Sequence, residues 1–186
     1  MGRKPRNCQL YVKGQSESKM PEAFFRDIQI ITDRNISTVR ELARIYGDAH
    51  AFIMPSAGEG WGLCLCEAQA TGLPCIWTAW SAMLDYADET TGYPITQFSM
   101  APFWPTGREN IGNPCLGAVA SEAAIIERME EIYGAYPEAL ARGKAASERM
   151  HSRYTWAQSA EKFNQICERA MEFPVLPSAA ARLAQP

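Results

Sequence analysis

The segment that most constrains how this chain can fold contains two short apolar runs, separated by a glycine-rich loop and a stretch of helical length. "AFIMP" (residues 51–55) and "PCIWT" (residues 74–78) are uninterrupted apolar runs, which are typical of buried parallel strands. Between them, "LCLCEAQAT" (residues 63–71) has the length of a helix and is followed by Gly72, a common helix stop. The succession of strand, loop, helix and strand predicts a βαβ unit.

The rest of the chain predicts further strands and helices around this unit. Thr38 and Glu41 form a capping box, which predicts a helix that begins near Val39. Ser121 and Thr155 have the residue type of a helix cap and precede later helical stretches. Further strands are expected at residues 8–14, 27–32, 91–96 and 116–120, and a long loop at residues 97–116.

Strands that alternate with helices imply an open sheet with helices on both faces. We therefore expect an α/β fold: a single Rossmann-like three-layer domain with a mostly parallel sheet of about five to six strands. The domain is expected over residues 1–174, and residues 175–186 are expected to form a C-terminal tail. Ligands of such sheets bind outside the carboxyl ends of the strands, and the glycine-rich loop follows such an end.

Length and charge limit what else the chain can be. Its 186 residues suffice for one domain with a sizeable core and are few for two. A net charge of −3 gives no general attraction to nucleic acid, and no apolar stretch approaches the roughly 18 residues that span a bilayer. Six cysteines without paired spacing and two histidines do not suggest a metal site. We expect a cytoplasmic protein without a nucleic-acid partner, a metal ion or a transmembrane segment.

The loop within "PSAGEGWGLCLCE" (residues 55–67) has two readings. Gly58, Gly60 and Gly62 recur at every second position, and glycine lets another group approach the backbone closely. The loop opens a helix whose first N–H groups carry partial positive charge, so it could bind an anion such as phosphate. The glycines could equally serve a tight strand-to-helix turn. The glycines alone leave these two readings open.

Two carboxylates favour a ligand. Glu67 lies in a helix that is apolar on nearly every side, where a carboxylate is costly unless a group binds it. A backbone N–H or the hydroxyls of a sugar could be that group. Glu59 lies in the loop itself, where it could face the same ligand or be a solvated acid. Eight residues separate the two acids, so the loop and one helical turn can direct both toward one ligand.

The segment "AFIMPSAGEGWGLCLCEAQATGLPCIWTAWSAMLDY" resembles the donor-binding signature of retaining GT-B glycosyltransferases, in particular glycosyltransferase family 4. That family carries "PS…EGFGL…EAMA.G.PVI" with two glutamates in an E-x7-E arrangement, which Glu59 and Glu67 match. Trp61 replaces the commoner phenylalanine, and Gln69 replaces the commoner methionine. The resemblance extends over roughly residues 28–170.

The resemblance implies a role for each matching position. Glu59 is implied to meet hydroxyls of the donor sugar, and Glu67 to hold the ribose hydroxyls of the nucleotide. Backbone N–H groups around Trp61, Gly62 and Leu63 are implied to face the diphosphate. The family needs no metal ion and no cofactor besides its nucleotide-sugar donor. The donor-binding residues implied in this way are Gly58, Gly60, Trp61, Gly62, Leu63 and Glu67, with Glu59 as the catalytic residue.

The resemblance also implies a second domain. The family's catalytic unit has two Rossmann-like halves with the active site between them, and this chain corresponds to the C-terminal, donor-binding half. We expect it to be inactive in hexose transfer without an N-terminal acceptor domain, and to associate with such a partner or with itself. The family's diphosphate-neutralising cations have only Arg3, Lys4 and Lys13 as candidates, by charge alone. A non-catalytic nucleotide or nucleotide-sugar binding module and a relic that binds nothing tightly are the alternatives.

Overall fold

The contacts of the computed structural model divide the chain into two units, Met1–Ile45 and Tyr46–Pro186. In the first unit, β1 (Gln9–Lys13) and β2 (Gln29–Asp33) pair in parallel. Both strands agree with the sequence prediction. The structure describes residues 9–13, 29–33, 38–103 and 114–172.

The helix α1 (Val39–Asp48) begins where the capping box predicts and crosses the boundary between the two units. The Glu41 N–H donates to Oγ1 of Thr38 at 3.2 Å, and the Thr38 N–H donates to Oε2 of Glu41 at 2.9 Å. These reciprocal bonds satisfy two N–H groups that the first helical turn leaves without intrahelical partners. The predicted helix start is confirmed.

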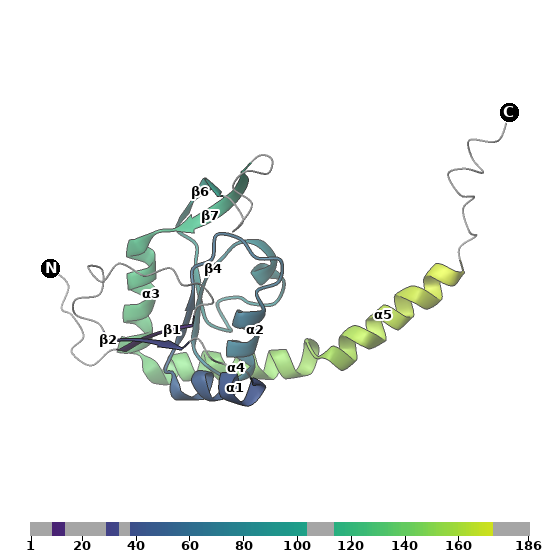
Figure 1. Ribbon diagram of the computed structural model, residues 1–186, viewed down its shortest axis with the longest axis horizontal. Helices are drawn as coiled ribbons and strands as arrows, with labels where there is room; N and C mark the ends of the chain where they lie inside the picture. Colours follow the sequence, from purple (N-terminus) through teal and green to yellow (C-terminus); the bar gives the residue numbers. More distant parts are fainter. Residues whose placement is uncertain (1–8, 14–28, 34–37, 104–113, 173–186) are drawn as a thin grey trace. The chain divides into compact units, whose positions relative to one another are not determined.

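The second unit is built on a parallel sheet in the order β3–β4–β5. All four residues of the central strand β4 (Cys75–Thr78) are buried, between β3 (Phe52–Met54) and β5 (Tyr93–Ile95). The helix α2 (Leu63–Ala70) connects β3 to β4, which confirms the predicted βαβ unit. In Figure 1, α2 and α3 (Glu122–Gly134) lie on opposite sides of β4.

Two further helices follow α3. The helix α4 (Tyr136–Arg153) packs against both α2 and α3, and α5 (Trp156–Met171) has no buried residue. Thr155 and Gln158 form the cap of α5 with reciprocal bonds, whereas Ser121 precedes α3 without a side-chain capping bond. Strands and helices share a core of Ile76, Tyr93, Ile95, Ala124, Ile132 and Ala139. Within the described ranges, no helix combines the length and apolar character needed to cross a membrane.

The predicted loop at residues 97–116 is wrong in part, because it contains a strand. The strand β6 (Phe98–Phe103) pairs antiparallel with β7 (Cys115–Ala120), from Phe98 opposite Ala120 to Phe103 opposite Cys115. A proline within "FSMAPF" argues against a strand in a sequence pattern, yet proline is tolerated on an edge strand. Pairing with β7, which lies well beyond a local sequence window, stabilises this segment as a strand.

The expected single sheet of about five to six strands is therefore not what the described residues form. Their seven strands make three sheets, of two, three and two strands, and one of the two-stranded sheets is antiparallel. The α/β class holds, with a parallel sheet of three strands at its centre. The division at residues 174 and 175 stays a prediction, because the expected tail lies outside the described residues.

Candidate functional site

The glycine-rich loop joins the carboxyl end of β3 to the first turn of α2, and Gly62 is the residue that turns the chain. Gly62 caps α2 in a left-handed conformation, with φ 80° and ψ 52°. A Cβ at this position would lie 2.9 Å from the Tyr86 hydroxyl oxygen and 3.3 Å from atoms of Met54 and Met83. Gly60 differs, because a Cβ there would meet nothing within 4 Å. The turn itself therefore requires glycine at Gly62 and leaves open space at Gly60.

The backbone of this loop is held by neighbours from two segments, the one that contains Ser81 and Tyr86 and the strand β7. The Tyr86 hydroxyl lies 2.9 Å from the carbonyl oxygen of Trp61 and 3.2 Å from that of Gly62, and donates toward them. The Ser81 hydroxyl donates to the carbonyl oxygen of Glu59 at 2.7 Å. On the β7 side, the Ala118 N–H donates to the carbonyl oxygen of Ala57 at 2.8 Å. The loop is thus fixed along its length.

The Tyr86 hydroxyl is protonated and can therefore donate these hydrogen bonds to the loop. Burial raises the pKa of its hydroxyl well above the ordinary value, and the neighbouring Cys66 and the charge of Glu59 raise it further. A protonated tyrosine hydroxyl can donate, whereas a phenolate could not. The Tyr86 side chain therefore remains a hydrogen-bond donor to the loop at neutral pH.

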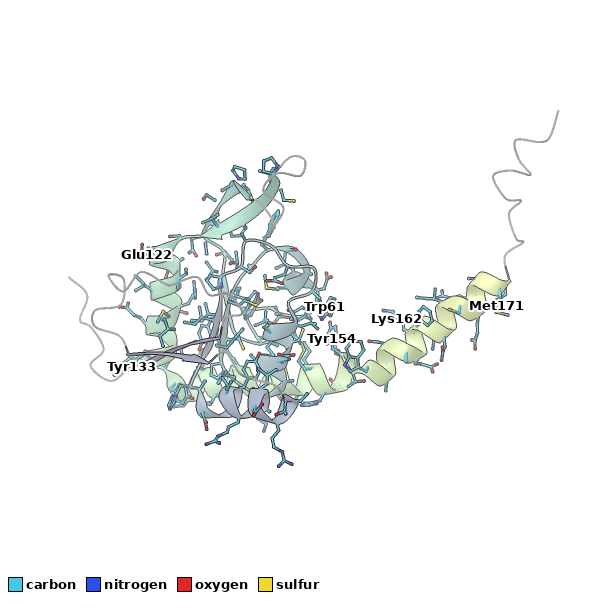
Figure 2. The ribbon with its side chains drawn as sticks, in the orientation of Figure 1. Trp61, Glu122, Tyr133, Tyr154, Lys162 and Met171 are labelled. Carbon is cyan, nitrogen blue, oxygen red and sulfur yellow. The ribbon has the colours of Figure 1, made fainter. Side chains whose placement is uncertain are left out.

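Three aromatic rings meet beside the loop. The Trp61 ring centre lies 5.2 Å from that of Tyr86 and 6.1 Å from that of Tyr154. Figure 2 shows Trp61 and Tyr154 near each other where α4 ends. The Tyr154 hydroxyl donates to the carbonyl oxygen of Asp85 at 2.9 Å. Trp61 remains 39% exposed, so part of its indole is available to a ligand.

Each glutamate of the pair accepts a hydrogen bond from one hydroxyl. Glu59 is half-buried, and the Ser56 hydroxyl lies 2.8 Å from its Oε1. Glu67 is exposed, and the Tyr46 hydroxyl lies 3.0 Å from its Oε2. Both hydroxyls donate and both carboxylates accept. The two acids are thus oriented by separate partners, one within the loop and one on α1.

The expected burial of the Glu67 carboxylate is wrong. The helix α2 buries Leu65, Ala68 and Gln69, while Glu67 is exposed. Apolar residues line nearly every side of this helix, so its sequence does not reveal which side packs against the sheet and α4. Glu67 therefore needs no ligand to offset burial, and its exposed position leaves it accessible to one.

The comparisons with known proteins place the chain in a family. Residues 3–163 match the family described as "Family 4 Glycosyltransferase in conflict systems". The chain belongs to this family. The match covers most of the chain, and it confirms the predicted resemblance to glycosyltransferase family 4.

Solved structures of two other proteins share the fold of this glycosyltransferase domain. A sucrose-phosphate synthase from Thermosynechococcus elongatus matches with a TM-score of 0.65 and 21% sequence identity, over 88% of this chain and 38% of that chain. A glycosyltransferase from Rickettsia africae matches with a TM-score of 0.52 and 17% identity, over 80% of this chain and 33% of that chain. The domain thus spans less than half of either protein. A search of curated protein sequences gave no match.

Sequence reasoning missed several side chains that support this glycosyltransferase loop. Ser81 and Tyr86 belong to the segment around the short helix η2 (Ser81–Asp85), which follows β4. Their signal was available, because polar residues after the carboxyl end of one parallel strand lie at the same sheet edge as the loop after its neighbour. Tyr46, on α1, lies outside the glycine–glutamate signature, so no sequence signal indicated its contact with Glu67.

The cations expected at the diphosphate of this family are not assigned by the structure. Arg3 and Lys4 lie outside the described residues, and Lys13 ends β1 in the first unit. The identity of the diphosphate-neutralising cation stays a prediction.

Gln69, which replaces the family's commoner methionine, gives a stability prediction. It is fully buried, and neither its Oε1 nor its Nε2 has a hydrogen-bond partner among the residues that the structure describes. Because an unpaired buried amide costs about 1–3 kcal/mol, we expect Gln69→Met to raise the free energy of unfolding by about that amount. Urea unfolding measures the change, and Gln165→Met on the exposed α5 serves as the control. A loss of stability in Gln69→Met would contradict the unpaired state of the amide.

Proposed function

We propose that the loop before α2 and the two glutamates bind a nucleoside-diphosphate sugar, as the donor half of a retaining hexosyltransferase. The observation that carries this proposal is the pairing of each carboxylate with its own hydroxyl donor, Ser56 on Glu59 and Tyr46 on Glu67. Carboxylates held in place this way are suited to accept hydrogen bonds from sugar hydroxyls. Membership of a glycosyltransferase family supports the assignment of the ligand.

The diphosphate would lie at the first turn of α2. Gly62 has no side chain to cap this helix, so an anionic ligand can take the place of a capping group. The N–H groups around Trp61, Gly62 and Leu63 are the proposed donors to the diphosphate oxygens. The partial positive charge of the helix terminus favours the same ligand. Open space around Gly60 would let the donor approach the backbone closely.

The same arrangement can stabilise charge that develops during transfer. When the bond between the sugar and the diphosphate breaks, negative charge grows on the leaving diphosphate and positive charge on the sugar carbon. Fixed dipoles at the start of α2 would stabilise the diphosphate without reorganising, because Tyr86 and Ser81 already hold the loop backbone. Glu59, on the sugar side, would bind the hydroxyls of the donor sugar and orient its ring.

A second domain, corresponding to the N-terminal acceptor domain of the family, would hold the acceptor. The sucrose-phosphate synthase with the same fold is matched over only 38% of its length. We therefore expect transfer by these residues to require an acceptor domain, supplied by a partner or by a second copy of the chain. The alternative is a module that binds the donor without transferring it. Product formation by the purified chain alone would contradict our expectation that it needs a partner.

Nucleotide binding is the decisive test of this function. Isothermal titration calorimetry with UDP, GDP and ADP, each with and without an attached sugar, is expected to find one nucleotide that binds. Glu67→Ala should lower the affinity for that nucleotide by about tenfold to 100-fold, because hydrogen bonds to a charged group are worth roughly 1.5–3 kcal/mol. Glu130→Ala, on the exposed surface of α3, is the matched control and should bind like the wild type. No binding by the wild type, or equal binding by Glu67→Ala, would refute the donor site.

A further inference from the structure

We propose that Tyr46 is a positioning residue, which orients the Glu67 carboxylate so that it can receive the two ribose hydroxyls of the donor. This inference rests on the proposed function and adds to it a residue that the glycine–glutamate signature does not contain. Tyr46 lies 21 positions before Glu67 in the chain and contacts it from α1.

The geometry gives Tyr46 one principal acceptor. Its hydroxyl lies 3.0 Å from Oε2 of Glu67 and 3.3 Å from the carbonyl oxygen of Cys64. A hydroxyl carries a single proton, so the shorter contact with the charged oxygen is the stronger one. The carbonyl of Cys64, one helical turn earlier, lies close enough to keep the Tyr46 hydroxyl over α2. Tyr46 therefore reaches the carboxylate from a fixed direction.

Tyr46 is itself held firmly. It is 8% exposed, and its ring packs edge-on against Phe52 with ring centres 5.9 Å apart. Burial raises the pKa of its hydroxyl, and the hydrogen bond and the charge of Glu67 raise it further, so the hydroxyl stays protonated and able to donate. By contrast, Glu67 is exposed and would otherwise exchange among several side-chain rotamers. The fixed side chain of Tyr46 thus limits the rotamers that the Glu67 side chain can adopt.

This bond leaves Glu67 able to bind a diol. An ionised carboxylate has two oxygens with roughly four lone-pair sites, and Tyr46 uses one of them on Oε2. Oε1 and the remaining sites are left for a pair of adjacent hydroxyls. If the carboxylate is fixed before the nucleotide arrives, less side-chain entropy is lost on binding. The expected contribution of Tyr46 is therefore specific to ligands that carry the ribose hydroxyls.

A comparison of ribose and dideoxyribose nucleotides tests this specificity. The probes are the nucleoside diphosphate that binds best among UDP, GDP and ADP, and its 2′,3′-dideoxy analogue, which offers Glu67 no hydroxyl. Tyr46→Phe keeps the ring and removes only the donor. The substitution should lower the affinity for the ribose form by about threefold to tenfold and leave the affinity for the dideoxy form unchanged. Calorimetry gives both affinities, and thermal unfolding checks that the variant is folded.

Two further variants separate positioning from structure. Ser56→Ala removes the hydroxyl that contacts Glu59 and should leave the ratio of ribose to dideoxy affinity unchanged. In a Glu67→Gln background, adding Tyr46→Phe should change this ratio much less than in the wild type, because the two residues act together.

Two results with Tyr46→Phe would overturn the inference while the proposed function stands. The first is an equal loss of both affinities in Tyr46→Phe, which would show a purely structural role. The second is a Tyr46→Phe variant that binds both forms as tightly as the wild type does. Absence of any nucleotide binding by the wild type would refute the donor site and this inference with it. A wild type that binds both forms equally would show that Glu67 does not contact the ribose.

Discussion

Gly62→Ala is expected to reduce nucleotide affinity by at least about 100-fold and to lower the free energy of unfolding by about 2–4 kcal/mol. Alanine in the left-handed conformation that Gly62 adopts is strained, and its Cβ would lie 2.9 Å from the Tyr86 hydroxyl oxygen. Tyr86 would have to move, and with it the carbonyls of Trp61 and Gly62 that it holds. The proposed diphosphate donors would then lose their alignment, and losing two charge-assisted hydrogen bonds accounts for the affinity change.

Gly60→Ala is the matched control for the stability part of this prediction. A Cβ at Gly60 meets nothing within 4 Å, so urea unfolding should show a change within about 0.5 kcal/mol. Equal destabilisation by the two substitutions would contradict the assignment of the turn to Gly62. Normal nucleotide binding by a folded Gly62→Ala protein would contradict the proposed diphosphate site at the first turn of α2.

The sequence was most informative where local signals decide the structure. The two apolar runs around the glycine-rich loop became β3 and β4, and the stretch between them became α2. The caps at Thr38 and Thr155 form with their bonding partners three residues later, as a capping box requires. Each of these features depends on residues within one or two helical turns, so a short window of sequence suffices to predict it.

The sequence was least informative where distant segments decide the structure. The strand β6 pairs with a segment beyond residues 104–113, and a local pattern with a proline does not predict that pairing. Glu67 was wrongly expected to be buried, because the apolar composition of α2 does not reveal which side of the helix faces solvent. Only the fold brings Tyr46 to Glu67 and Tyr86 to Gly62. Motif residues are thus readable in sequence, whereas the side chains that orient them are not.

Trp77→Ala should cause the largest loss of stability, about 3–5 kcal/mol. Trp77 is fully buried on the central strand β4, and the backbone of Gly92 packs so closely on its ring that a Cβ there would lie 2.6 Å from it. Its indole N–H has no hydrogen-bond partner among the described residues, so the lost packing dominates the cost. Urea unfolding should find Trp156→Ala, at a site that is 86% exposed, within about 0.5 kcal/mol of the wild type. A comparable loss for Trp156→Ala would contradict the exposure of α5, and a small loss for Trp77→Ala would contradict the central place of β4 in the core.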